Sequence, residues 1–526
     1  MKNYIFIFIT VISVFSFNSY AQKAQIASAD KKYDNFAYID AIKTYERVAE
    51  KGYKSEDMFQ KLGNSYYFNG ELDKAAKWYD ELFAMAPDQE PEYYYRYAQS
   101  LKAVGQTDKA NEMLEKFRQK AGNDNRATLI KKNRNYQDII RANSGRYKIE
   151  DAGINSKYSD YGSSLYGNKL VFTSSRDTGS LMHRKHKWTN QYFTNMYSAE
   201  TTPEGTLEAP EKFAKNINSK FHESTPVFTK DGNIMYFTRN NFNGGKKGKD
   251  ANKITLLKIY KATLSENRWQ KATELSFNSD TYSTAHPMLS PDEKTLYFAS
   301  DMPGTKGQSD LWKVSINGDG TFGTPVNLGD AINTEGKETF PLVTEENELY
   351  FATDGHPGLG GLDIFMARMN PDGSFQAPIN IGAPANSPQD DFAYLIDTKT
   401  RKGFLSSNRE GGKGFDDIYK FLETRKLVCE QELSGIVIDT ETGEILPKTK
   451  VTLFDEKFTK IEEVTADDKG FYQFKSVECG KVYYVRAEKE EYDTKEQRIT
   501  IAKTTGKTDL PIQLEKTVKP VKVGDD

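Results

Sequence analysis

Three carboxylates in the middle of the chain could act together, because each stands at the same place in a repeated sequence pattern. Glu223, Glu338 and Asp390 each lie three residues before the proline or alanine of that pattern. Thr284 occupies this place in one repeat, and Asp160 fits the first repeat loosely. Such carboxylates around one channel mouth would suit a hard cation such as Ca²⁺, or a basic partner. The interpretation we favour is that they cap backbone amides where each strand begins.

The sequence lacks the motifs of several enzyme classes. It contains no G-x-S-x-G, no H-E-x-x-H or H-x-x-E zinc pattern and no phosphate-binding G-x-x-x-x-G-K-[ST]. The five histidines are scattered over the repeats: His183, His186, His222, His286 and His356. His183 and His186 could share a helix face, but a surface pair is a simpler interpretation than a metal site. We therefore expect no catalytic residue, no bound metal and no cofactor.

The two cysteines, Cys429 and Cys479, both lie in the last hundred residues. Neither belongs to a C-x-x-C pair or stands beside a histidine at ligand spacing, which argues against zinc. In an oxidising compartment we expect a disulfide between them, with two buried thiols as the alternative. In the chain-entropy model, closing the loop of about 50 residues between them would stabilise the fold by about 3–4 kcal/mol.

Length and charge narrow the class of protein. A chain of 526 residues predicts about three domains. The 72 Lys and Arg residues nearly balance the 75 Asp and Glu residues, so no nucleic-acid partner is expected. The mean hydropathy of −0.71 excludes a polytopic membrane protein. Residues 1–21 carry Lys2, an apolar run and small residues before Gln22, a pattern typical of a secretory signal peptide, and no membrane span is expected after its cleavage.

Residues 22–122 repeat with a period of 34–35 residues, as the spacing of Ala41, Ala75 and Ala110 indicates. Small Gly63 and Ala75 would let paired helices approach closely, and Gly70 would end the first helix of its pair. The segment resembles three tetratricopeptide repeats, which form an α-solenoid. The resemblance implies a concave groove for an extended partner segment, and a mere spacer is the alternative. The groove residues would be Asp57, Gln60, Asn64, Tyr67, Glu92, Tyr95, Gln99 and Lys102.

The basic segment 123–147 is interpreted as a helix followed by a linker. Residues 148–425 then repeat a pattern of a strand, a glycine-rich turn and a second strand. The strand cores centre on Phe172, Phe237, Phe298, Phe351 and Phe404, and each period predicts one four-stranded antiparallel sheet. The pattern resembles the repeat of TolB-like periplasmic β-propellers. It predicts five blades, or six if residues 146–155 complete a further sheet. We expect Asp310, Asp363 and Asp417 to satisfy backbone N–H groups of the turns.

Residues 426–516 show two strand–turn–strand schemes, with turns at Gly443 and Gly470. They resemble the carboxypeptidase regulatory-like domain, a small all-β sandwich, and 517–526 reads as an extended tail. The fold class expected is therefore multidomain: an N-terminal α-solenoid, a central all-β propeller and a C-terminal all-β sandwich.

Taken in order, these segments resemble envelope proteins of the PorE type, which belong to the type IX secretion and gliding machinery. In that family an OmpA-like peptidoglycan-binding domain follows the sandwich, whereas this sequence stops at Asp526. We expect the chain to be either a truncated form or a variant without that domain. We also expect the protein to contact peptidoglycan only indirectly. The resemblance implies a periplasmic protein held at the outer membrane or cell wall by partners.

Three classes of function follow. The first is a non-enzymatic scaffold whose partners are other envelope or secretion-system proteins. The alternatives are a periplasmic propeller that binds a small ligand or glycan, and an enzyme with its chemistry in the propeller channel. The three repeated carboxylates are the only support for the enzyme.

Overall fold

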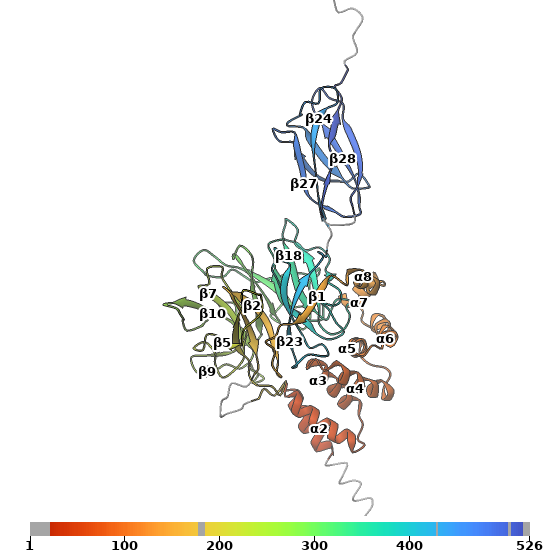
Figure 1. The fold of residues 1–526 in the computed structure, drawn as a ribbon. Coiled ribbons are helices and arrows are strands. Elements are labelled where there is room, and N and C mark those ends of the chain that lie inside the picture. The colour runs from red at the N-terminus through yellow and green to blue at the C-terminus, as the bar shows by residue number, and fades with distance from the viewer. Residues whose placement is uncertain (1–21, 177–184, 428–429, 503–505, 519–526) are drawn as a thin grey trace, which may run out of the picture. The chain divides into compact units, whose positions relative to one another are not determined.

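The chain forms two compact units, one up to Thr424 and one from Arg425 onward. The computed structural model describes residues 22–176, 185–427, 430–502 and 506–518, and Figure 1 shows their ribbon. The predicted signal peptide, His183, Cys429 and most of the predicted tail lie outside these residues. Within them, none of the helices is long and apolar enough to cross a membrane.

The first part of the larger unit is helical, and we call residues 22–143 the helical region. A helix over residues 22–33 leads into seven further helices. These are α2 (Tyr38–Glu50), α3 (Glu56–Phe68), α4 (Leu72–Met85), α5 (Pro91–Ala103), α6 (Thr107–Lys120), α7 (Asn125–Lys132) and α8 (Tyr136–Asn143). The helices α3 and α4 pack as one pair and α5 and α6 as the next.

The small residues of the repeat act as predicted. A Cβ atom on Gly63 would lie 2.5 Å from Cε1 of Tyr79, so only glycine allows α3 and α4 to approach this closely. Gly70 has a φ of +71° just after α3 ends, a conformation that glycine adopts at little cost.

In the larger unit, the described residues that follow the helical region form five antiparallel sheets and one short hairpin. The first contains β2 (Asp160–Tyr166), β3 (Lys169–Ser174), β4 (Asn195–Glu200) and β5 (Glu211–Lys212). The second contains β6 (Glu223–Phe228), β7 (Ile234–Asn240), β10 (Leu257–Ser265), β11 (Arg268–Trp269) and β12 (Thr273–Glu274), with a separate hairpin of β8 (Phe242–Asn243) and β9 (Lys246–Lys247). The third contains β13 (Thr284–Leu289), β14 (Thr295–Ser300), β15 (Asp310–Ser315) and β16 (Val326–Asn327).

The fourth sheet contains β17 (Glu338–Val343), β18 (Glu348–Thr353), β19 (Asp363–Arg368) and β20 (Ile379–Asn380). The fifth contains β21 (Asp391–Ile396), β22 (Lys402–Ser407), β23 (Asp417–Glu423) and β1 (Tyr147–Asp151). The five predicted strand cores are β3, β7, β14, β18 and β22, the second strand of each sheet. All six residues of β18 are buried, as stacking of neighbouring sheets requires.

The five sheets form a closed ring, which we call the sheet ring. The first strand of each sheet contacts the first strand of the next, and β21 of the fifth sheet contacts β2 of the first. The strand β1 comes before all other strands of the ring in the sequence. It pairs with β23, the last strand of the ring, so that Tyr147 lies opposite Glu423 and Asp151 lies opposite Tyr419. Residues 147–151 therefore complete the fifth sheet instead of adding a sixth.

A β-bulge recurs in the first strand of every sheet and sets its register. The third residue of each strand has a positive φ, which inserts one residue and increases the local twist. These residues are Gly162, Thr225, His286, Phe340 and Ala393. Aromatic rings on these strands meet, with 3.8 Å between the centroids of His286 and Phe340 and 4.9 Å between Phe340 and Phe392.

The smaller unit is a two-sheet β domain. One sheet has the order β27-β24-β30, with β31 also on β24, and the other has the order β26-β25-β28-β29. The strands are β24 (Glu430–Asp439), β25 (Lys450–Phe454), β26 (Lys460–Thr465), β27 (Phe471–Glu478), β28 (Val482–Glu488), β29 (Lys495–Thr500), β30 (Gly506–Asp509) and β31 (Ile512–Leu514). Leu433, Val451 and Phe474 belong to its buried core. Cys479 is disulfide-bonded; because Cys429 lies outside the described residues, the pairing of the two stays a prediction.

Arg146 stands where the helical region, the fourth sheet and the closure of the ring meet. Its side chain is fully buried and forms an ion pair with Glu423 on β23. Its Nε donates to the carbonyl of Asn143 at 2.9 Å, and its Nη2 donates to the carbonyl of Ile381 at 2.9 Å. One guanidinium therefore ties the end of α8 to two sheets.

We predict that Arg146→Met lowers the free energy of unfolding by about 3 kcal/mol, because it removes one partner of a buried ion pair and leaves two carbonyls unsatisfied. Urea titration followed by tryptophan fluorescence measures this loss. Arg141→Met is the control, since Arg141 is 78% exposed in its pair with Asp138, and we expect a change below about 0.5 kcal/mol. Equal effects of the two substitutions would contradict the role given to Arg146.

Candidate functional site

The predicted groove of the helical region is occupied by the chain itself. The turn between β18 and β19 lies against α3 and α5, where four of the eight predicted groove residues bind it. Tyr67 donates to Oδ2 of Asp354 at 3.2 Å, and the hydroxyl of Tyr95 donates to the carbonyl of the same residue. Gln99 donates to the carbonyls of Asp354 at 3.2 Å and Gly360 at 3.1 Å. Lys102 donates to the carbonyl of Gly358 at 3.0 Å.

The glycines of this turn are required by how closely it is packed. A Cβ atom on Gly360 would overlap the carbonyl oxygen of Pro388, and one on Gly361 would overlap Oδ1 of Asp390. The Gly361 position would also be 3.1 Å from Leu72 of α4. The turn is therefore held between the helical region and the segment before β21, and any side chain here would force them apart.

The other four predicted groove residues bind within the helical region. Asn64 is buried and contacts the hydroxyls of Tyr33 and Tyr79 and the guanidinium of Arg96. The remaining three pair as Gln60 with Gln89, Asp57 with Lys61, and Glu92 with both Arg96 and Arg126. The expectation of an open groove for a separate partner is thus corrected. Tyr67, Tyr95, Gln99 and Lys102 recognise a turn of the same chain, and Asn64 is a packing residue.

Further contacts extend this interface on both sides. Asn408 donates to the carbonyl of Gly70 at 3.1 Å, next to the end of α3. Trp188, from the segment between β3 and β4, donates to the carbonyl of Phe68 at 3.2 Å. At the other end, the backbone N–H of Asn125 donates to Glu335 at 2.9 Å. The helical region and the sheet ring are joined through their backbones as well as their side chains.

The repeated carboxylates lie at the first position of the first strand in four of the five sheets: Asp160, Glu223, Glu338 and Asp391. Each is fully buried and accepts a hydrogen bond from the backbone N–H four residues earlier, as Glu338 does from Thr334 at 2.8 Å. Thr284 takes the same position in β13. These acids therefore cap the turn that enters each strand, the interpretation favoured from the sequence.

Asp390 does not belong to this set, because the equivalent residue is Asp391. Asp390 stands one residue before β21, where its Oδ1 accepts from the N–H of Leu362 at 2.8 Å. Its Oδ2 faces Gly70 of the helical region. Burial raises the pKa of Asp390 to about 6. Its place is at the interface with the helical region, which the sequence alignment did not predict.

The capping acids differ in their cationic partners. Asp160, Glu223 and Asp391 form ion pairs with Arg176, Arg239 and Arg409. Glu338 has hydroxyl donors instead, Thr334 and Thr353, both at 2.7 Å. Burial raises the pKa of Glu338 to about 8, and these hydrogen bonds lower it by less. At neutral pH the Glu338 carboxyl is thus held mainly in its protonated form.

The turn aspartates act as predicted. Asp310 accepts from the N–H groups of Lys306 and Gly307, Asp363 from those of Leu359 and Gly360, and Asp417 from those of Lys413 and Gly414. Each therefore satisfies the backbone of its own glycine-rich turn. Within the described residues, no group of three or more His, Cys, Asp or Glu side chains is arranged to hold a metal ion.

The described histidines lie in separate places, apart from one pair. The rings of His186 and His222 are 4.6 Å apart between centroids. Burial lowers the pKa of His222 to about 3, so this pair is neutral at physiological pH. His286 packs against the ring of Phe340, and His356 contacts the carbonyl of Ile332 at 2.9 Å.

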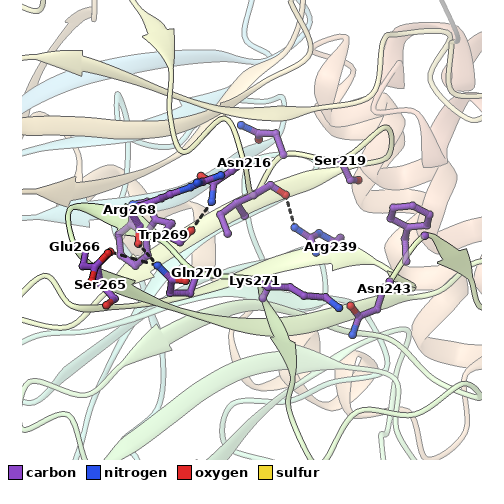
Figure 2. Close-up of a pocket in the computed structure, with 16 residues that line it drawn as sticks. Asn216, Ser219, Arg239, Asn243, Ser265, Glu266, Arg268, Trp269, Gln270 and Lys271 are labelled. Atoms are coloured by element: carbon purple, nitrogen blue, oxygen red, sulfur yellow. Dashed lines mark hydrogen bonds between the residues drawn. The ribbon is translucent and has the colours of Figure 1, made fainter.

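The sequence did not indicate a pocket of about 680 Å³ on the second sheet. Figure 2 shows it between the segment that leads into β6 and the segment around β11, with Arg268 and Lys271 on its walls and Arg239 in its floor. The excess of lysine in the sequence of this sheet is the feature that could have indicated the pocket.

Comparison with known proteins identifies one part of the chain. Residues 432–515 match the family model of the carboxypeptidase regulatory-like domain, so the smaller unit contains that domain. No curated protein matches the chain in sequence.

Several solved structures are similar at low identity. A putative TolB from Agrobacterium tumefaciens is 13% identical over 63% of this chain and 97% of its own, with a TM-score of 0.32. An α-L-arabinofuranosidase from Lactobacillus brevis is 13% identical over 54% of this chain and 93% of its own, also with a TM-score of 0.32. A point mutant of the catechol 1,2-dioxygenase from Acinetobacter radioresistens is 10% identical over 19% of this chain, with a TM-score of 0.15, and the chain spans 56% of that protein's length.

We predict that Glu338→Gln makes the protein's stability less dependent on pH. The ordinary pKa of this carboxyl is 4.5, and the folded protein raises it to about 8. Folding therefore takes up a proton between these values, so stability is complete below pH 4.5 and falls by at most about 1.4 kcal/mol per pH unit as the pH rises toward 8. Glutamine mimics the protonated acid. The variant should match the parent at pH 4 and be more stable by roughly 2–4 kcal/mol at pH 8.

Urea titrations at the two pH values measure this difference. Glu223→Gln is the matched control, because it leaves Arg239 buried without its carboxylate and should cost about 3 kcal/mol at pH 8. If Glu338→Gln destabilised the protein at pH 8 as Glu223→Gln does, Glu338 would be an ionised residue and the account of it would be wrong.

Proposed function

We propose that the protein is a non-enzymatic scaffold, a periplasmic subunit of a bacterial envelope complex that belongs to the type IX secretion or gliding machinery. In this proposal the helical region is a set of tetratricopeptide repeats and the sheet ring is a five-bladed β-propeller. The regulatory-like domain follows them in the order typical of PorE-type proteins. Its partners are other envelope proteins, which hold it at the outer membrane or cell wall.

The observation that carries the proposal is the contact between the helical region and the sheet ring. Side chains of α5 bind the backbone of residues 354–360, and Asn125 and Arg146 bind the ring further along the chain. A scaffold has to hold its binding surfaces at fixed distances, and a polar interface of this extent gives the two parts one fixed geometry. A flexible linker between independent modules would not do so.

The roles of the repeated acids favour a scaffold over an enzyme in the channel. Asp160, Glu223 and Asp391 are each occupied by a backbone N–H group and an arginine, and Glu338 by a backbone N–H group and two hydroxyls. A general acid or base has to exchange protons with a substrate, and these carboxyl groups already serve as buried caps. The positions of these carboxyl groups are explained by the hydrogen bonds with which they stabilise each turn.

Affinity purification of the full chain from envelope fractions tests the proposal. We expect stoichiometric co-purifying proteins, and we expect Gln99→Leu plus Lys102→Met to reduce their recovery at least about fivefold, because these substitutions remove hydrogen bonds that fix the helical region on the ring. Lys116→Met plus Gln119→Leu, the same changes on the exposed side of α6, is the control and should leave recovery unchanged. Absence of any stoichiometric partner in the parent preparation would contradict a scaffold.

A further inference from the structure

Two features of the second sheet surround a pocket. A tight turn at Glu266 and Asn267, both with positive φ, leads from β10 to β11, and the β8–β9 hairpin extends from the end of β7. Between them lies the pocket of about 680 Å³, a volume within the usual range for small-molecule sites. Asn216 fixes one wall by donating to the carbonyl of Trp269.

Positive charge is concentrated in the segment that runs from β5, the last strand of the first sheet, through the second sheet. Residues 211–280 contain 13 Lys and Arg residues against 7 Asp and Glu residues, a net charge of +6 in a chain whose total is −3. Burial lowers the pKa of Lys212, while the nearby Glu223 raises it and Lys215 lowers it. The local field of such a region attracts anions.

Two cations of the pocket have no partner in the described part of the chain. Arg268 and Lys271 line it and are exposed, and neither side chain forms an ion pair or donates a hydrogen bond. Figure 2 shows Lys271 extending toward Asn243, whose amide is also unengaged among the described residues. Arg239, by contrast, is buried in the floor and is held by Glu223 and the carbonyl of Ile217. Arg239 is therefore held in place at the bottom of the pocket, whereas the side chains of Arg268, Lys271 and Asn243 are available to bind a ligand.

The walls offer more hydrogen-bonding groups than aromatic surface. Trp269 is buried, and its ring packs against Tyr166, Phe213 and Phe228. Phe242 packs against Phe221, with 4.9 Å between ring centroids. Amides and cations with little aromatic surface suit a hydrophilic ligand with hydroxyl groups and an anionic group better than they suit an aromatic anion.

We propose that this pocket binds a small sugar that carries an anionic group, either a carboxylate or a phosphate. Arg268 and Lys271 bind the anion, and the amides of Asn216 and Asn243 bind hydroxyl groups. This activity is separate from the scaffold function and does not depend on it.

Isothermal titration calorimetry of the full chain with four probes tests the proposal: D-glucuronate, D-glucose 6-phosphate, D-glucose and inorganic phosphate. We expect at least one of the two anionic sugars to bind, which also tells carboxylate from phosphate, and glucose to give no signal. Arg268→Gln plus Lys271→Gln should raise the Kd at least about tenfold, because each removes a charge-assisted hydrogen bond. Lys294→Gln plus Lys399→Gln, the same loss of charge on exposed residues of other sheets, should leave the Kd unchanged.

Three results would overturn the proposal. The first is no binding of either anionic sugar at millimolar concentration. The second is inorganic phosphate binding as tightly as the sugars, which would leave the amides without a role. The third is binding to vesicles that contain phosphatidylglycerol, abolished by the Arg268→Gln plus Lys271→Gln variant, while neither sugar binds; the basic surface would then recognise a membrane.

Discussion

The larger unit depends on one contact, the docking of the backbone of residues 354–360 against α5. Three carbonyls of this turn, those of Asp354, Gly358 and Gly360, accept hydrogen bonds from Tyr95, Gln99 and Lys102. Buried carbonyls without such donors would cost about 1–3 kcal/mol each. The turn can reach these donors because its glycines allow neighbouring backbone to approach. The position of the helical region on the sheet ring follows from this contact.

The sheet ring is closed by the pairing of its first strand in sequence, β1, with its last, β23. Because β1 pairs with β23, the first and last strands of the ring belong to one sheet, and opening the ring would expose the edges of both. Arg146 connects this closure to the end of α8. The two features together make the helical region and the ring mutually dependent, which is the property that the scaffold proposal uses.

Local features of the fold could be predicted from the sequence, because their signals lie within a few residues. The five strand cores, the roles of Gly63 and Gly70, and the aspartates of the glycine-rich turns are of this kind. The occupant of the groove could not be predicted, since Tyr95 and Asp354 are 259 residues apart in sequence. The sequence shows that this turn is rich in glycine, but a glycine does not specify what approaches it.

The error at Asp390 has a specific physical cause. The alignment matched Ala393 to Pro341, but the structure shows that Ala393 is the bulged residue with positive φ and corresponds to Phe340. The bulge is the same in all five sheets, so it did not cause the error. The fifth sheet has Tyr394 where the fourth has Pro341, and because two acids, Asp390 and Asp391, are adjacent, the sequence alone did not show which one is equivalent to Glu338. The pocket on the second sheet was missed because Arg268 and Lys271 are two exposed cations three residues apart, a pattern that is typical of any solvated surface.

The central claim is that the helical region and the sheet ring unfold as one body. Pulsed hydrogen exchange with mass spectrometry, on the full chain in increasing urea, tests it most directly. The account predicts that peptides from α5 and from β18–β19 lose protection at the same urea concentration. Loss of protection in α5 at a clearly lower concentration, while β18–β19 stay protected, would contradict it.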